Sequence, residues 1–420
     1  MPVRRPFVPL AAAVAAAALA ALALAPRLSA QEDGLSLEQA VETALARHPD
    51  ILAAKARVEA ARGRTLQLRA RPEPQLAAGL EGLPLPGLRN EGDEIEVSLG
   101  IEGTFEYPGK RALRTDIGRR GEELAEAELD RLRLGLAVRV KRAYWAAVFA
   151  GGAAAALERS SARLDALAED LEAQYRNGAA AYADVLRVRA EKARLRNQVL
   201  EQAREERAAE LSLAELLGRD DGGPVPLTTP LPFEPLETGL DALVERARSG
   251  RPSFRIATLR VAQADAAVEL AGLARRPDFL AGFLLPSVRP NAWGVTLGLT
   301  LPFLSPGRSK GLALEAASEA EAGRREAEAL DRRVRTAVAG AYAAAKSAEG
   351  QVLTYEKSLL RELEEELGIE LEYFRYGKTK AFDLLDLHRT FVLAQVEHLR
   401  ALYLYNLALA DLEAAGEETL

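Results

Sequence analysis

The sequence predicts a mainly α-helical protein with a small β part, built as two tandem copies of one structural unit. Three observations favour this fold class. Two stretches of more than a hundred residues, which follow Pro108 and Pro306, contain no proline. Short segments that alternate apolar and polar residues precede each stretch. Both features recur at an offset of about 199 residues, which indicates an internal repeat.

Residues 1–30 are predicted to be a secretory signal peptide. A basic head at Arg4 and Arg5 precedes an uninterrupted apolar core over residues 10–25, and small residues lead to the expected cleavage point. A membrane anchor is the alternative. The apolar core is short for a spanning helix, however, and Pro26 breaks it.

Composition excludes several classes of protein. The chain has no cysteine, so it is not expected to carry disulfides or to be a lipoprotein anchored through an N-terminal cysteine. Its formal net charge is −7, and an acidic chain argues against nucleic acid as a partner. Aromatic residues make up only 5% of the chain, so the apolar content is mostly Ala, Leu and Val, which suits long helices.

The first repeat is predicted to span residues 31–218. It starts with a helix, for which Ser36 and Gln39 form a capping-box pattern. Two strands at 74–82 and 94–103 follow, and a long helical hairpin over 110–217 completes the unit. One face of the second strand is apolar: Ile95, Val97, Leu99 and Ile101.

The second repeat is predicted to span residues 238–416, after a proline-rich linker at 219–237. Thr238 and Asp241 repeat the capping pattern at its first helix. The strands are expected at 278–285 and 293–301 and the helical hairpin at 308–415. One face of the last strand is again apolar, and it carries Trp293, Val295, Leu297 and Leu299.

Each long helical stretch is expected to turn once. Gly178 in "YRNGAAAYADVL" and Gly377 in "FRYGKTKAFDLL" can take the positive φ that ends a helix. Leucines at seven-residue intervals predict a coiled-coil seam: Leu157, Leu164 and Leu171, then Leu353, Leu360 and Leu367. A helix over residues 110–176 would be about 100 Å long, which exceeds what a compact domain needs.

The four predicted strands have the length of tilted outer-membrane strands. Four strands cannot close into a barrel, an open sheet edge is not tolerated in lipid, and the smallest closed barrels have about eight strands. Three copies of the chain would contribute twelve strands, with the apolar faces toward lipid. An ordinary half-buried sheet in a soluble domain is the alternative reading of the strands alone.

Four stretches carry a resemblance to a known family. They are "LSLEQAVETALARHPDILAAKARVEAA" after the leader, the "YPGKR" junction from Tyr107, "YRNGAAAYADVL", and "RYGKTKAFDLLDLHRTFVLAQVEHLRALYLYNLALADLEAAG" near the end. In this order they resemble the TolC family of outer-membrane efflux channels. The "PGKR" junction and the short chain look closest to the branch that serves heavy-metal efflux pumps.

The resemblance implies a homotrimer in the outer membrane, whose twelve-stranded barrel continues into a helical tunnel across the periplasm. It implies three further partners: outer-membrane lipid, a periplasmic adaptor protein and an inner-membrane transporter. Small molecules or metal ions would pass through passively. The resemblance implies no cofactor and no catalytic step.

Asp383 and Asp386 are the candidate periplasmic gate. They are three residues apart and follow Gly377, so on a helix both point along one face. In the family, acidic residues in this position ring the periplasmic entrance. The alternative is a helix-start role in which the carboxylates interact with the helix dipole. In the first repeat, Asp184 matches Asp383, but Arg187 stands where the second carboxylate would be.

Residues around the two turns are the candidate adaptor contacts: Gly178, Gly377, Arg176 and Arg375. The candidate junction between barrel and tunnel is formed by two Pro-Gly pairs: Pro108 with Gly109, and Pro306 with Gly307. Each pair is expected to combine one fixed φ and one unrestricted φ where strand gives way to helix. The basic residues that follow are expected to meet lipid phosphates: Lys110, Arg111, Arg114, Arg308 and Lys310.

Metal binding and catalysis are not predicted. The histidines are His48, His388 and His398, and no two of them have the spacing of a helical metal site. No nucleophile elbow, phosphate loop or metalloprotease helix is present. The competing class is a periplasmic coiled-coil spacer or envelope tether without a pore. It explains the long helices but gives the alternating segments no purpose.

Overall fold

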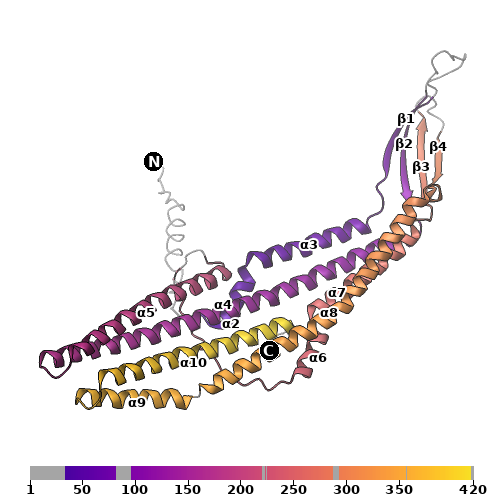
Figure 1. Ribbon diagram of the computed structural model, residues 1–420. Coiled ribbons are helices and arrows are strands. Elements are labelled where there is room, and N and C mark those ends of the chain that lie inside the picture. Colours follow the sequence, from indigo (N-terminus) through magenta and orange to yellow (C-terminus); the bar gives the residue numbers. More distant parts are fainter. Residues whose placement is uncertain are drawn as a thin grey trace, which may run out of the picture.

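The computed structural model describes residues 34–81, 96–219, 223, 225–286, 293–355 and 357–417. The predicted signal peptide and Ile95 lie outside this part of the chain. The molecule is elongated, with a small sheet at one end and two helical hairpin tips at the other (Figure 1). The predicted fold class, mainly helical with a small β part, is confirmed.

The first half of the chain forms helices and strands in the following order: α2 (Leu37–Arg47), α3 (Pro49–Arg69), β1 (Gln75–Glu81), β2 (Glu96–Phe105), α4 (Lys110–Arg176) and α5 (Tyr182–Leu216). The second half contains α6 (Leu240–Gly250), α7 (Pro252–Leu273), β3 (Phe279–Pro286), β4 (Gly294–Leu299), the 3₁₀ turn η1 (Pro302–Leu304), α8 (Pro306–Thr354), α9 (Lys357–Arg375) and α10 (Ala381–Gly416).

The helix that opens each half is divided in two by a proline. His48 ends α2 and caps α3, because its Nδ1 accepts a hydrogen bond from the Asp50 amide at 3.2 Å and Pro49 occupies the first turn. The capping box at Ser36 is confirmed. The matching pattern predicted at Thr238 is wrong, because Gly239 caps α6 without a side-chain hydrogen bond.

The strands form one antiparallel sheet in the order β1-β2-β3-β4. The central pairing joins the two halves, with Phe105 opposite Phe279 at one end and Ser98 opposite Pro286 at the other. Among the described residues, β1 and β4 each pair on one side only. The sheet therefore has two open edges.

The two outgoing helices differ. Helix α4 runs for 67 residues without a break, and α5 returns beside it. The second outgoing helix was expected to be equally continuous, but α8 ends at Thr354 and α9 starts at Lys357. The backbone leaves the helical conformation at Tyr355 (φ −92°, ψ 55°), where the ring packs against the buried cluster around Tyr405.

The linker holds the two halves together at mid-length. The Tyr144 hydroxyl donates to the Leu35 carbonyl at 2.9 Å and accepts from the Thr229 amide at 3.0 Å. From the other half, the Asn406 amide donates to the Pro232 carbonyl at 2.8 Å. From Val225 onward, the linker is thus a strap that is bonded to both hairpins.

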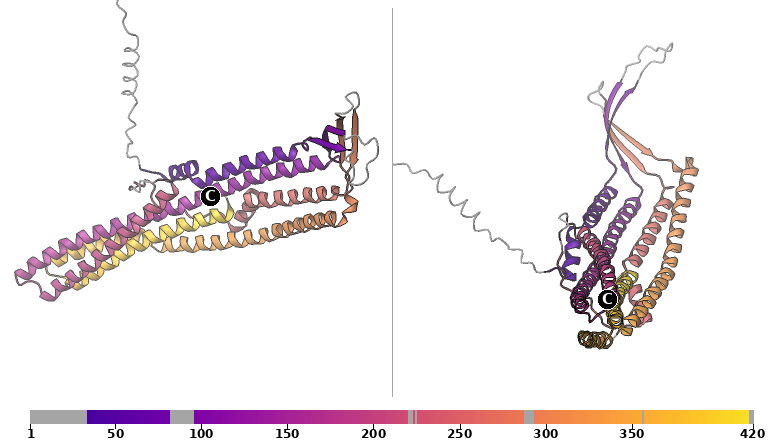
Figure 2. Two further views of the ribbon diagram at one scale, coloured as in Figure 1. Left: turned by 90° about the horizontal axis from the view of Figure 1, so that it is seen from above. Right: turned by 60° about the vertical axis from the view of Figure 1, so that its left-hand side comes forward.

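The core is a series of buried clusters along the long axis rather than one centre. The cluster nearest the tips joins α4 and α5 to α9 and α10 through leucines, valines and Phe391. Two further views show the two hairpins side by side over this length, with both tips at the end away from the sheet (Figure 2). The Leu157, Leu164 and Leu171 seam lies inside this cluster.

Candidate functional site

One face of the sheet is apolar and exposed across all four strands. The pairing register places Leu76 opposite Ile101, Ile101 opposite Phe283, and Phe283 opposite Val295. Leu76 and Leu297 are 76% and 79% exposed, and the other large members of this face are also exposed: Leu80, Val97, Leu99, Ile101, Phe105, Phe279, Phe283, Leu285, Val295 and Leu299. Trp293, just before β4, is 69% exposed. No described segment of the chain covers this face.

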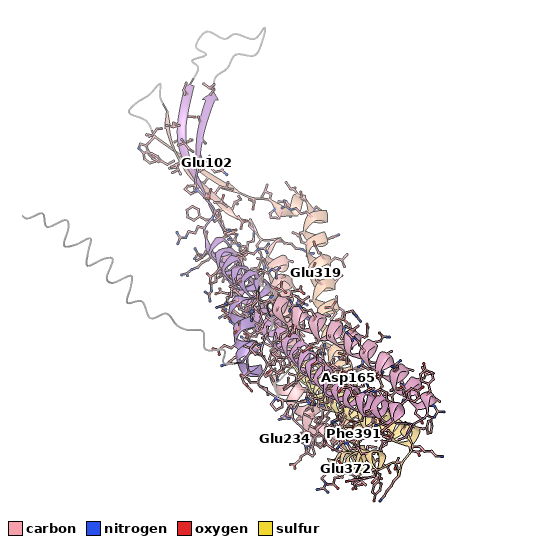
Figure 3. The ribbon with its side chains drawn as sticks, turned by 90° about the vertical axis from the view of Figure 1, so that its left-hand side faces the viewer. Glu102, Asp165, Glu234, Glu319, Glu372 and Phe391 are labelled. Atoms are coloured by element: carbon pink, nitrogen blue, oxygen red, sulfur yellow. The ribbon has the colours of Figure 1, made fainter. Side chains whose placement is uncertain are left out.

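The opposite face carries mostly small or polar residues, with Leu280 and Leu284 of β3 as its large apolar side chains. A Cβ at Gly100 would lie 2.4 Å from Leu284 Cδ2, and one at Gly282 would lie 2.8 Å from Glu102 Cγ, so glycine lets these larger side chains lie against the sheet. Figure 3 labels Glu102 on the sheet. The charged residues within the four strands are all glutamates, namely Glu81, Glu96 and Glu102.

The two Pro-Gly pairs at the base of the sheet have different geometries. Gly109 caps α4 with a φ of +96°, as expected for a junction that needs unrestricted backbone. Gly307 lies in the first turn of α8 and has no positive φ. The expectation for Gly307 is wrong, because η1 makes the change of direction and Pro306 can then start the helix directly.

Two of the basic residues at the junction have partners within the chain. Lys110 Nζ lies 2.8 Å from Asp278 Oδ1, and the same oxygen accepts a hydrogen bond from the Tyr107 amide at 2.7 Å. Arg114 pairs with Glu106. The expectation that Lys110 and Arg114 meet lipid phosphates is therefore not supported. Lys110 fixes the start of α4 to Asp278, just before β3, and Arg114 fixes it to Glu106, just after β2.

The two hairpin tips share one backbone geometry. The positive φ predicted at Gly178 and Gly377 is confirmed, with values of +74° and +70°. In each tip the amide after the glycine donates to a carbonyl five residues back, at 2.8 Å for Ala179 and 2.9 Å for Lys378. This Schellman motif satisfies the end of the outgoing helix before the chain turns. Arg176 and Arg375 are exposed beside the turns.

Exposed aromatic residues surround the tips, and none of the sequence patterns predicted them: Tyr175, Tyr182, Tyr373, Tyr376 and Phe382. The Tyr175 and Tyr182 rings lie 5.5 Å apart, and the Arg187 guanidinium lies 6.0 Å from the Phe382 ring centroid. The last contact joins the two tips. The available signal was the concentration of aromatic residues near both glycines in a chain that has few of them.

The candidate gate carboxylates have different surroundings. Asp383 and Asp386 are exposed on the first two turns of α10, and none of the ion pairs among the described residues includes either of them. Asp184 forms an ion pair with Arg187 on the same helix, with 3.2 Å between the Asp184 Oδ1 and Arg187 Nη1 atoms. The structure thus places an acidic pair without a close ion-pair partner on the second tip and an ion-paired carboxylate on the first.

A buried polar cluster lies between the hairpins, above the tips. His388 is 5% exposed and Glu191 is 6% exposed, and Ser160 lies in the same region. Glu191 pairs with Arg389. The hydrogen bond from Arg389 lowers the pKa of the Glu191 carboxyl, while burial lowers the pKa of the His388 imidazole. The sequence showed His388 only as an unsuitable metal ligand, because the contact with Glu191 joins positions far apart in the chain.

No helix in the described ranges is both long and apolar enough to cross a membrane. Among the same residues, no three His, Cys, Asp or Glu side chains are grouped in a way that could hold a metal ion.

Comparison with known proteins identifies the class. The sequence model of the outer membrane efflux protein family matches residues 40–219 and 243–416, one stretch in each half. This is most of the chain, so the protein belongs to the outer membrane efflux protein family. The predicted family is confirmed.

Several solved outer-membrane channels share the fold. The structure of VceC from Vibrio cholerae matches with a TM-score of 0.72 at 18% sequence identity, over 91% of this chain and 97% of that chain. CusC matches with a TM-score of 0.75 at 18% identity, over 90% and 91%. The open state of MtrE from Neisseria gonorrhoeae matches with a TM-score of 0.73 at 21% identity, over 91% and 89%. No curated protein sequence matches.

Proposed function

We propose that three copies of this protein form a passive efflux duct in the outer membrane. Four strands from each copy would close a twelve-stranded barrel, and the helices would continue as a tunnel into the periplasm. The observation that carries the proposal is the sheet, which has one continuous exposed apolar face, an opposite face rich in glycine, and two open edges.

The physical argument starts from the open edges. A lipid-facing sheet must pair every backbone group, so β1 and β4 need partner strands from other copies. An apolar face of this extent in water would favour aggregation, whereas lipid is its natural solvent. The competing spacer function leaves this face in water, so the duct is favoured.

The remaining parts of the proposal rest on the family to which the chain belongs and on the geometry of the two hairpin tips. Residues 1–30 would be removed as the signal peptide during export. The tips around Gly178 and Gly377 would contact a periplasmic adaptor, which would connect the duct to an inner-membrane transporter. Asp383 and Asp386 would line the periplasmic entrance. Small molecules or metal ions, as in the heavy-metal branch, would pass without a chemical step.

The two halves are proposed to be tandem repeats, residues 31–218 and 238–416. Support comes from the family match in each half and from the shared order of helices, strands and hairpin. The strand segments, the linker and the hairpins would then be equivalent parts that differ in detail.

Adjacent residues of β4 provide a matched test of the barrel. Leu297 points to the apolar face and Thr296 to the polar face. We expect Leu297→Arg to lose most membrane insertion, because an arginine on the lipid face near mid-bilayer costs about 2–4 kcal/mol. Thr296→Arg should insert close to the wild-type level. The measurement is the yield of folded trimer in outer-membrane fractions.

Two results would contradict the proposal. One is normal insertion of the Leu297→Arg variant, which would mean that this face does not meet lipid. The other is the absence of conductance when purified wild-type trimer is added to planar bilayers. Fractionation of the mature wild-type protein as a soluble species would favour the spacer.

A further inference from the structure

His388 occupies a central position in the packing between the two hairpins. It lies on α10, five residues after Asp383, so it is about 7–8 Å further along the helix axis from the tip. Its side chain is almost fully buried, and its Nε2 atom has no hydrogen-bond partner. The buried cluster around it contains Leu157, Val188 and Phe391, which come from α4, α5 and α10 respectively.

Charged groups face this site from each neighbouring helix. Helix α4 contributes Arg163, which lies 5.6 Å from the Phe391 ring centroid and 3.0 Å from Glu364 of α9. Helix α5 contributes Glu191 and Arg194, and the Oε1 atom of Glu191 lies 3.7 Å from the Nη1 atom of Arg194. Helix α10 itself contributes Arg389, which pairs with Glu191.

The balance of these groups disfavours a positive charge on His388. Burial is the largest cause of its lowered pKa, and Arg163 and Arg389 act in the same direction. A hydrogen bond with the Ser160 backbone and the charge of the Glu191 carboxylate both raise the pKa of His388. Glu191 stabilises a positive charge on His388 only to a limited extent, because its carboxylate already interacts with Arg389 and Arg194.

We propose that His388 is an acid-sensitive latch: as a neutral imidazole it holds α10 against the α4–α5 hairpin, and its protonation loosens this contact. The proton would enter a buried site in which the ring nitrogen Nε2 has no acceptor. The arrangement that relieves this cost is one in which the hairpins separate and water reaches the ring. The helices between the linker strap and the tips would then open locally.

The direction with pH follows from linkage. A histidine whose pKa is lower in the packed state than in the open state takes up protons on opening, so packing is most stable above the ordinary histidine pKa of about 6.5. As the pH falls below this value, the opening equilibrium rises by up to about tenfold per pH unit. The rise ends when the pH reaches the pKa of the packed state.

The consequence for transport rests on the proposed duct, because only there does the latch lie next to a gate. Asp383 and the Arg187–Phe382 contact lie on the tip side of His388. Loosening of α10 at His388 would therefore change the placement of both tips. In the proposed duct, a fall in the periplasmic pH would therefore favour the arrangement of the periplasmic entrance in which α10 is loosened.

Hydrogen exchange measured on the intact trimer tests the latch without using conductance. Peptides that cover residues 157–171 and 384–396 should exchange faster as the pH falls from 7.5 to 5.5, after correction for the intrinsic exchange rate. His388→Gln removes the titrating group, and its corrected exchange should be independent of pH over this range. His398→Gln, ten residues along the same helix, should keep the wild-type response.

A second measurement covers the case in which His388→Gln does not fold. The chain has three histidines, so the imidazole signals of the labelled wild-type trimer can be assigned by His48→Gln and His398→Gln. The His388 signal should titrate below pH 6.5. A His388 signal that titrates at or above pH 6.5, or corrected exchange that does not respond to pH in the wild type, would overturn the latch. Failure of conductance alone would overturn the duct and leave the latch intact.

Discussion

The two halves of the molecule contain the same order of elements, but they differ at each functional end. The first half enters α4 through a glycine with positive φ, runs without a break to Arg176, and neutralises Asp184 with Arg187. The second half enters α8 through a 3₁₀ turn, breaks at Tyr355, and exposes Asp383 and Asp386. The first half therefore contains one continuous long helix, whereas the second contains an interrupted helix and an exposed acidic pair.

The junction glycines give the largest expected contrast between the halves. Gly109→Ala should destabilise the protein by about 1–3 kcal/mol, because alanine is strained at a φ of +96°. Gly307→Ala should instead stabilise it by up to about 1 kcal/mol, since Gly307 is helical and no atom lies within 4 Å of an added Cβ. Thermal unfolding of the two variants checks this opposite sign. Equal losses would show that both junctions need glycine.

The tip carboxylates give a functional contrast. The variant Asp383→Asn/Asp386→Asn should reduce the cation preference of the duct and its block by multivalent cations by several-fold, because a ring of carboxylates favours cations. Asp184→Asn should have a smaller effect, since Arg187 already offsets that charge. Reversal potentials under a salt gradient measure the difference. An equal effect from Asp184→Asn would remove the distinction between the two tips.

The smallest expected contrast concerns two arginine–glutamate pairs. Glu191 is buried and joins the halves through Arg389, whereas Glu172 pairs with Arg189 of its own hairpin in an exposed position. Both carboxyls have a lowered pKa, with the arginine hydrogen bond as the main cause. A lowered carboxyl pKa stabilises the fold above the ordinary value of about 4.3, and this contribution is lost as pH falls through the folded-state pKa.

The Glu191→Gln variant should therefore lose less stability than the wild type as the pH falls. The Glu172→Gln variant should lose about as much as the wild type, because exposed ion pairs contribute little to stability. Unfolding midpoints measured between pH 6 and pH 3 compare them. The same acid response in Glu191→Gln as in the wild type would show that the pair between halves does not contribute.

Local patterns predicted much of the fold because they depend on neighbouring residues. The alternation around Val97 and Leu297, the leucine spacing after Leu157 and the glycines at the tips all describe what the backbone does within a few residues. The mainly helical class with a small sheet followed from such signals. The single helix expected at the start of each half failed at the X-Pro positions, where the residue before Pro49 is driven to an extended conformation.

Features that depend on distant parts of the chain could not be predicted. The difference between Gly109 and Gly307 depends on whether a 3₁₀ turn precedes the helix. The break at Tyr355 depends on packing next to the linker, and the partners of Lys110 and His388 come from the other half. For the candidate sites, the sequence identified the charged and turning residues, while their neutralisation or burial required the three-dimensional arrangement.

The pairing of β2 with β3 has a consequence for the order of folding. Phe105 cannot meet Phe279 until the linker, α6 and α7 have emerged, and the strap that bonds to Tyr144 also arrives after α5. Such distant pairings close large loops and are slow. During synthesis, the first half alone would therefore hold two strands and an incomplete core. We expect the complete apolar face of the sheet to form only after β3 and β4 have joined β1 and β2, so in the proposed duct the chain would gain the surface that commits it to a membrane after its first half has been made.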